Sequence, residues 1–183
     1  MCLRDHGTYH INSVEPIEVF YKLRVDLDKL KYAVHINKII QDVTHENQNC
    51  YSILQLFLNT LYVIAETDEN LDRILSVFKL RLLCILGFTP QIMECVTNKE
   101  KEELAYFSIK DNGVKCKICG KQDTSSIEIS QSTLNAIRYT VTAPPKKIYA
   151  FDLKETALEE FKLVTKIYFN EKLEKEYKLE ELF

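Results

Sequence analysis

Residues 78–90 read Phe-Lys-Leu-Arg-Leu-Leu-Cys-Ile-Leu-Gly-Phe-Thr-Pro, a largely apolar run that stops at a glycine. Upstream, Thr67–Asn70 supplies a capping side chain and acids for a first helical turn. Downstream, Gly87 suits the left-handed position that follows a helix, and Pro90 cannot continue one. The pattern predicts a helix over Leu71–Leu86, and a helix this apolar belongs in a protein core.

Two helical segments precede this one. Between Ile17 and Ile40 the apolar residues fall on one helical face, which predicts one long helix or two helices joined near Arg24–Asp28. The segment Tyr51–Ala65 is apolar nearly all round, so we expect a core helix that is buried on every side.

Two further helices are expected towards the C-terminus. Ser130–Val141 has a helical pattern that Pro144-Pro145 ends. Asp152–Glu155 has the form of a capping box that opens a last helix to about Lys175. The chain has only four Gly and four Pro, which favours a few long helices over many short strands. The fold class is therefore mainly α, a helical bundle domain.

A short β-hairpin interrupts the helical pattern within residues 91–129. Tyr106–Lys110 and Gly113–Lys115 carry strand-like residues and flank Asp111-Asn112-Gly113, a strong hairpin turn signal. We expect a small hairpin insert there.

The overall composition limits the compartment and the partners. The net charge of −3 gives no cationic field for nucleic acid over the whole chain, so any such contact must be local. There is neither an export signal nor an apolar run of membrane-spanning length, and the cytosol is expected. The six cysteines are then expected to be reduced, and the close pair Cys116 and Cys119 is a metal or redox candidate. Because the chain has no nucleophile elbow, phosphate-binding glycine loop or zinc-protease helix, we expect no enzyme.

Three segments, in order, resemble the RecO family. Glu18–Arg24, with Tyr32-Ala33 after it, is similar to the first helix that follows the family's N-terminal barrel. The Phe78–Pro90 run with Cys95 shortly after it is similar to the family's apolar-and-Arg helix, its Gly-aromatic-x-Pro exit and its first zinc-ligand Cys. Phe107-Ser108 and Gly113–Cys119 are similar to its Cys-x-x-Cys hairpin. The resemblance implies a zinc-finger-like β-hairpin insert at about residues 91–129.

The resemblance also implies a domain division. It begins at what would be the last strand of an N-terminal OB-type barrel, which needs about five strands. Residues 1–15 would be a remnant of that barrel, and residues 16–183 the helical domain with its Cys-containing insert.

The function that the resemblance implies is mediation of DNA repair and homologous recombination in the RecF pathway. Such a non-catalytic module would bring RecA onto DNA coated by single-strand DNA-binding protein, together with RecR, and would sit with the nucleoid in the cytoplasm. Single-stranded DNA would be bound weakly. The alternative is a truncated, free-standing helical domain with a structural purpose and no repair role.

The resemblance implies that Cys95, Cys116 and Cys119 are zinc ligands. Where the family has its remaining Cys, this chain has Asn98, a poor zinc ligand. A fourth ligand would come from Glu94, Glu102 or water, and the zinc would be held weakly. Alternatively, the insert folds by apolar packing alone and leaves three reduced thiols without a stable metal.

Local positive charge offers candidate binding residues. Six lysines against four acids between Cys95 and Lys121 give a local charge of +2. Lys110, Lys115 and Lys117 would contact phosphates beside aromatic residues of the hairpin, or they are a solvated surface. On the Leu71–Leu86 helix, Arg81 would receive an acidic peptide together with the cations Arg73 and Lys79, or these form the wet face of the helix.

Overall fold

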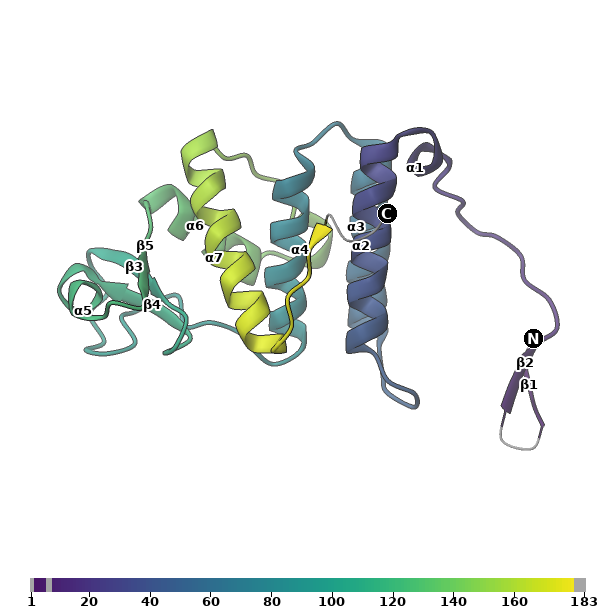
Figure 1. Cartoon of the computed structure of the whole chain (residues 1–183), viewed down its shortest axis with the longest axis horizontal. Helices are drawn as coiled ribbons and strands as arrows, with labels where there is room; N and C mark the ends of the chain where they lie inside the picture. The colour runs from purple at the N-terminus through teal and green to yellow at the C-terminus, as the bar shows by residue number, and fades with distance from the viewer. Residues whose placement is uncertain (1, 6–7, 180–183) are drawn as a thin grey trace.

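The computed structural model describes residues 2–5 and 8–179, in which long helices stand side by side with a small sheet beyond them (Figure 1). The helices are α1 (Tyr21–Val25), α2 (Leu27–Val43), α3 (Tyr51–Glu66), α4 (Leu71–Ile85), α5 (Lys117–Gln122), α6 (Gln131–Thr142), a 3-10 turn at Pro145–Lys147, and α7 (Glu155–Leu173). The strands are β1 (Cys2–Asp5), β2 (Thr8–Ile11), β3 (Leu104–Ser108), β4 (Gly113–Cys116) and β5 (Ser126–Glu128). The prediction of a mainly α fold is confirmed.

Helix α4 is the centre of the bundle, because α2 and α3 pack on one side of it and α6 and α7 on the other (Figure 1). Every residue from Arg73 to Leu80 is buried, and Phe78, Leu82 and Leu83 have no accessible surface. Each buried Leu or Phe contributes roughly 1.5–3 kcal/mol to folding. The apolar run predicted to form the core therefore does so.

Both ends of α4 follow the sequence signals. The Asn70 side chain accepts a hydrogen bond from the Arg73 amide at 3.0 Å and caps the first turn. At the other end Gly87 has a φ of +96°, and the amides of Gly87 and Phe88 donate to the carbonyls of Cys84 and Leu83. This pair of bonds is a Schellman motif, which explains the glycine.

The N-terminal helical segment is two helices. Asp26 is extended and interrupts α1 and α2, and its carboxylate accepts from the Lys29 amide at 3.0 Å. Of the two alternatives open from the sequence, the break near Arg24–Asp28 is the one observed, because an aspartate at this point is a good N-cap.

The prediction that α3 is buried on every side is wrong. Its inner face is buried, but Tyr51, Leu54, Leu58 and Tyr62 are about half exposed or more. The reason is position, since α3 packs on α1, α2 and α4 and leaves one face uncovered. Neither α3 nor any other helix within residues 2–5 and 8–179 has the length and apolar content to cross a membrane.

The predicted capping box before α7 is also wrong. The Asp152 carboxylate accepts from the amide of its neighbour Leu153, and α7 begins only at Glu155, with no side-chain cap. Because Asp152 binds the adjacent amide, it does not reach the amides of the first helical turn. The far end, at Leu173, lies close to the predicted end.

The insert contains the predicted hairpin and two unpredicted elements. β3 pairs antiparallel with β4 through a turn in which Asn112 has a φ of +57°, and β5 adds to the other edge of β3, in the order β4-β3-β5. Helix α5 follows β4 directly. Phe107 meets Tyr168 of α7 edge-on, with ring centroids 5.3 Å apart, and so fixes the sheet to the bundle.

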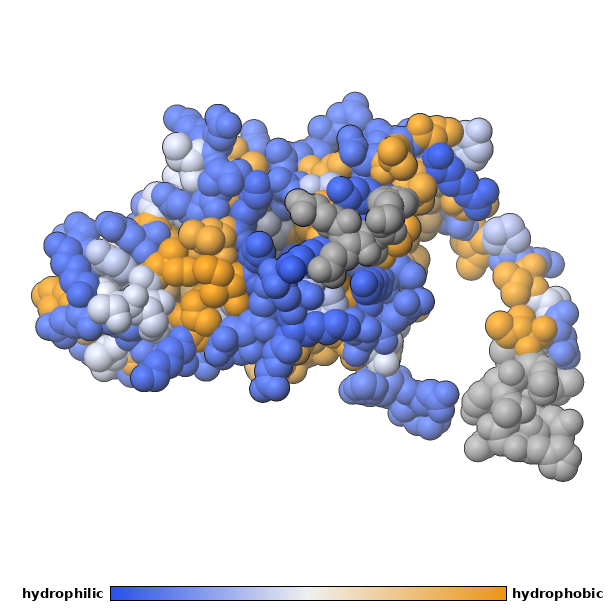
Figure 2. Space-filling view, in the orientation of Figure 1, coloured by the Kyte–Doolittle hydropathy of each residue, from blue (hydrophilic) through white to orange (hydrophobic). Residues whose placement is uncertain are grey.

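The segment before α1 carries the hairpin β1-β2, whose strands pair with each other, Cys2 opposite Ile11. Ile11, Val14, Ile17 and Val19 are exposed, and Figure 2 shows apolar surface along this segment. Met1, His6, Gly7 and 180–183 lie outside the described residues, and the division of the chain at residue 15 stays a prediction.

Arg73 and Lys79 do not lie on a solvent-exposed face of α4, because both residues are buried. The Arg73 guanidinium donates to the carbonyl oxygens of Tyr149 and Phe151 and forms an ion pair with Glu69. It thereby fixes the segment between α6 and α7 to the centre of the bundle.

We predict that Arg73→Ala lowers the free energy of unfolding by about 3–5 kcal/mol, because it leaves two carbonyls and a carboxylate without their donor. Urea denaturation measures the change. Arg24→Ala, on the exposed surface of α1, is the matched control and should change stability by less than about 0.5 kcal/mol. Equal effects of the two substitutions would contradict the role given to Arg73.

Candidate metal centre

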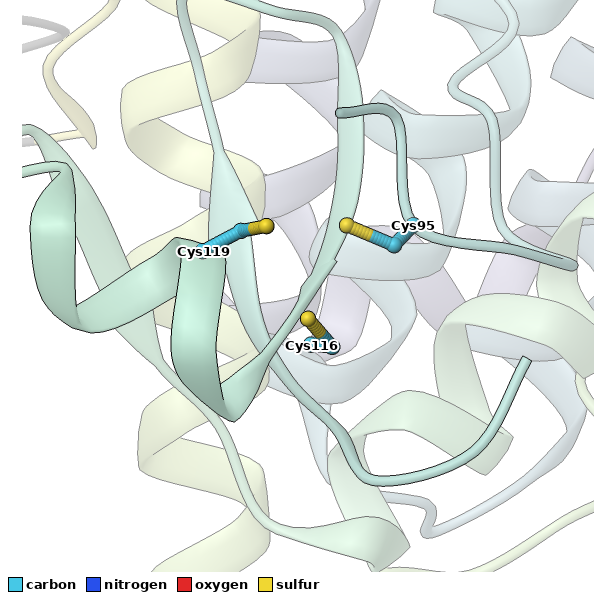
Figure 3. Close-up of side chains that lie close together, drawn as sticks. All are labelled: Cys95, Cys116 and Cys119. Atoms are coloured by element: carbon cyan, nitrogen blue, oxygen red, sulfur yellow. The ribbon is translucent and has the colours of Figure 1, made fainter. Parts of the chain in front are cut away.

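Three cysteines from separate parts of the insert meet at one point. Cys95 lies in the loop after α4, Cys116 ends β4, and Cys119 lies in the first turn of α5. Their sulfur atoms all lie within 4.8 Å of one another and point inward (Figure 3). The structure thus brings together the three residues that the sequence analysis selected.

Local backbone geometry positions each thiol. Around Cys95 the chain turns tightly, since its amide donates to the Glu100 carbonyl and its carbonyl accepts from the Lys99 amide. Cys116 and Cys119 are three apart across the start of a helix, which places both thiols on one side of a single turn. Helix α5 lies very close to β3, because a Cβ at Gly120 would come within 2.2 Å of the Tyr106 ring.

The thiols differ in acidity. Burial opposes ionisation of Cys95, but the amides of Asn98, Cys116 and Thr97 face its sulfur and together lower its pKa. Burial, followed by the neighbouring thiols of Cys116 and Cys95, raises the pKa of Cys119. Cys95 therefore ionises more readily than Cys119, and a cation among the sulfurs would favour ionisation of Cys119.

Asn98 lies beside the cysteine cluster. Its side-chain nitrogen lies 3.6 Å from the Cys116 sulfur. Neither Glu94 nor Glu102 joins the cluster within the described residues, and Glu94 instead pairs with Lys99 at 3.4 Å. The cluster thus offers three soft sulfurs with a neutral amide nearby, which fits a single thiophilic metal ion with one weak or open position.

The four basic residues that the sequence analysis proposed for binding of DNA or a partner differ in their surroundings. Lys110 is exposed at the hairpin turn, and Lys117 is exposed on α5, 3.3 Å from Glu103. Lys115 is buried and pairs with Asp111 at 2.5 Å and Asp123 at 2.7 Å. Arg81 is half-buried and donates to the carbonyls of Thr140 and Val141, at the end of α6.

Asp123 is an important residue of the insert that the sequence analysis missed. Its carboxylate accepts from Lys115, Ser108, Ser125 and Ser126. The hydrogen bond from Lys115, followed by those from Ser125 and Ser126, holds the pKa of Asp123 far below its usual range. The i,i+4 spacing of Asp111 and Lys115 was visible in the sequence, but nothing there indicated that Asp123 folds back to the same ammonium group.

The comparisons with known proteins bear on this fold and this cluster together. The family model for the C-terminal part of recombination protein O matches residues 24–181, which include every helix from α2 to α7 and all three cysteines. The chain belongs to the RecO family. RecO proteins are non-catalytic mediators of recombination, so the expectation of a DNA repair protein that is not an enzyme is confirmed.

Named relatives are similar along most of the chain. DNA repair protein RecO of Acetivibrio thermocellus is 36% identical over 170 residues, which are 92% of this chain and 68% of the relative. The RecO protein of Alkaliphilus metalliredigens is 29% identical over 166 residues, 90% of this chain and 68% of its own length. That of Bacillus subtilis is 26% identical over 149 residues, or 81% and 58%.

We predict that Lys115→Met destabilises this RecO insert more than Lys110→Met does. Lys115→Met leaves Asp111 and Asp123 facing each other without their shared ammonium group, whereas the Lys110 side chain lies in solvent. Thermal unfolding compares the two variants under the same conditions. A larger loss for Lys110→Met would show that the buried network does not stabilise the hairpin.

Proposed function

We propose that this RecO chain acts in the RecF pathway as a non-catalytic module that contacts protein partners through its helical bundle and single-stranded DNA weakly through its insert. The partners would be RecR and single-strand DNA-binding protein, and the site of action the nucleoid in the cytoplasm. Family membership supports the role. The charge distribution of the insert is the observation that supports weak binding of single-stranded DNA.

Internal pairing reduces the positive charge that the insert can offer to phosphates. Lys115 is used within the hairpin and Arg81 within the bundle. Of the four candidate cations only Lys110, beside the turn, and Lys117, on α5, are exposed, and Lys117 also pairs with Glu103 at 3.3 Å. Affinity for nucleic acid rises with the number of phosphates neutralised, so two such contacts support weak binding that salt abolishes.

We predict that replacing Lys110 and Lys117 together by Ala lowers the salt dependence of binding to a labelled single-stranded oligonucleotide. The slope of log affinity against log salt should fall by about 1.4, because each lost contact to a single strand removes about 0.7. Fluorescence anisotropy over a salt series measures it. The double variant of Lys146 and Lys147, exposed on the 3-10 turn, is the matched control. Unchanged slopes in both variants would show that Lys110 and Lys117 of the insert do not contact the DNA.

We further propose that zinc binds Cys95, Cys116 and Cys119, with Asn98 or water at the fourth position. Three thiols within 4.8 Å of one another, with amides directed at one of them, support this assignment. Zinc would join the loop after α4 to β4 and α5. The resulting site is weaker than one with four cysteines, because an amide is a poor replacement for a thiolate.

We predict that Asn98→Cys strengthens zinc binding by about tenfold or more, which is about 1.4 kcal/mol or more, because a fourth thiolate completes the tetrahedron. Cys119→Ser should weaken binding to a similar degree. Competition against a zinc-binding dye measures both, and Cys50→Ser, before α3, is the control for loss of a distant thiol. One tightly held zinc that is unaffected by Cys119→Ser would show that the ligands are different.

A further inference from the structure

A second polar site lies in the bundle and shares no residue with the cysteine cluster. It is a cleft of about 390 Å³ between α2, α4, α7 and the segment that follows α7. The polar side chains that matter in its lining are His35, Asp72, Lys79, Lys162, Lys166 and Glu176. A volume of this size lies within the range of small-ligand sites.

Lys79 is a buried cation in this cleft. It comes from the middle of α4, is 6% exposed, and its ammonium nitrogen lies 5.5 Å from the centre of the Phe169 ring. Among the described residues no carboxylate lies within ion-pair distance of it. Burial, followed by the nearby charge of Lys166, lowers the pKa of Lys79 to about 8. A buried cation without a counter-ion is unfavourable, and an anion in the cleft would relieve it.

His35 of α2 faces the same cleft with an unused nitrogen. It is 1% exposed, and its Nε2 atom has no hydrogen-bond partner within the described part of the chain. Burial, followed by Lys79, lowers its pKa to about 4, so the ring is neutral at neutral pH. Buried ring nitrogens are usually hydrogen-bonded, and this one points to a missing group.

The remaining charges of the cleft leave a positive excess. Lys162 is neutralised by Asp72 and Glu159, each at 2.8 Å. Glu176 lies 3.6 Å from Lys178. Lys166 is exposed and has no ion pair within residues 2–5 and 8–179, so two ammonium groups, those of Lys79 and Lys166, remain without a counter-ion.

We propose that this cleft binds a phosphate dianion, either inorganic phosphate or the terminal group of a phosphate monoester. Two lysines match two negative charges, and lysine binds phosphate as a point charge, whereas planar carboxylate recognition favours arginine, which the lining lacks. Monohydrogen phosphate carries acceptor oxygens and one P–OH group, so it can satisfy His35 in either tautomer.

A peptide with acidic side chains fits the cleft less well than phosphate does. Leu75, Tyr177 and Leu179 are its main apolar lining residues, and a peptide would need a larger apolar pocket to anchor its side chains. Glu180 and Glu181 directly follow the lining residue Leu179 in the sequence. Their carboxylates are a competing occupant of the cleft, and the experiment must distinguish them from phosphate.

The test is calorimetric titration of the whole chain with inorganic phosphate at neutral pH, against sodium chloride of equal ionic strength, with proton NMR of the histidine rings as a local readout. We expect saturable binding, a shift of the His35 resonances, and affinity lower by roughly tenfold or more in Lys79→Met. Lys146→Met, outside the cleft, should bind as the parent does. Thymidine monophosphate compared with inorganic phosphate shows whether a phosphate monoester binds more tightly than the free ion, and thymidine is the control without phosphate.

Three results would overturn the proposal. The first is phosphate binding that Lys79→Met leaves unchanged while the variant stays folded. The second is binding that appears only when Glu180 and Glu181 are both changed to Gln, which would assign the cleft to the chain's own carboxylates. The third is a His35 shift with an acidic peptide and none with phosphate.

Discussion

The burial of α4 on all sides is the constraint on which the rest of this RecO fold depends. A helix surrounded by four others must satisfy its polar groups inside the protein. Arg73 therefore binds carbonyls of the segment between α6 and α7, Arg81 binds carbonyls at the end of α6, and Ser76 donates to the carbonyl of Asp72. The same burial leaves Lys79 without a described counter-ion, so the packing requirement and the proposed anion site have one origin.

The sequence predicted the features that depend on neighbouring residues. The C-terminus of α4 at Gly87, the break at Asp26 and the hairpin turn at Asn112 each follow from the conformational preference of one residue and its immediate surroundings. Cys95, Cys116 and Cys119 were also identified in advance, because their spacing matched that of a family with a known order of cysteines.

Features that depend on distant residues could not be predicted. The exposed side of α3 carries Leu54 and Leu58, and nothing within α3 indicates that no helix covers it. Lys115 has the sequence context of a surface lysine, yet Asp123, eight residues away, makes it an internal one. Arg73 likewise has the spacing of an exposed residue, and its acceptors lie 76 and 78 residues further along the chain. Periodicity identifies the amphipathic face of a helix, but the neighbours of that face are set by the tertiary fold.

The contact between Gly120 and the Tyr106 ring has a consequence for the proposed zinc site. It locks the first turn of α5 against β3, while the Phe107 and Tyr168 rings hold that strand to α7. The arrangement of the three thiols is therefore preorganised by aromatic packing, and little chain entropy would be lost if an ion were bound. In classical zinc fingers, by contrast, binding and folding are one event. If the insert binds the proposed zinc ion, it would exchange that ion without unfolding, and metal occupancy would follow the free metal concentration while the shape of the hairpin stays constant.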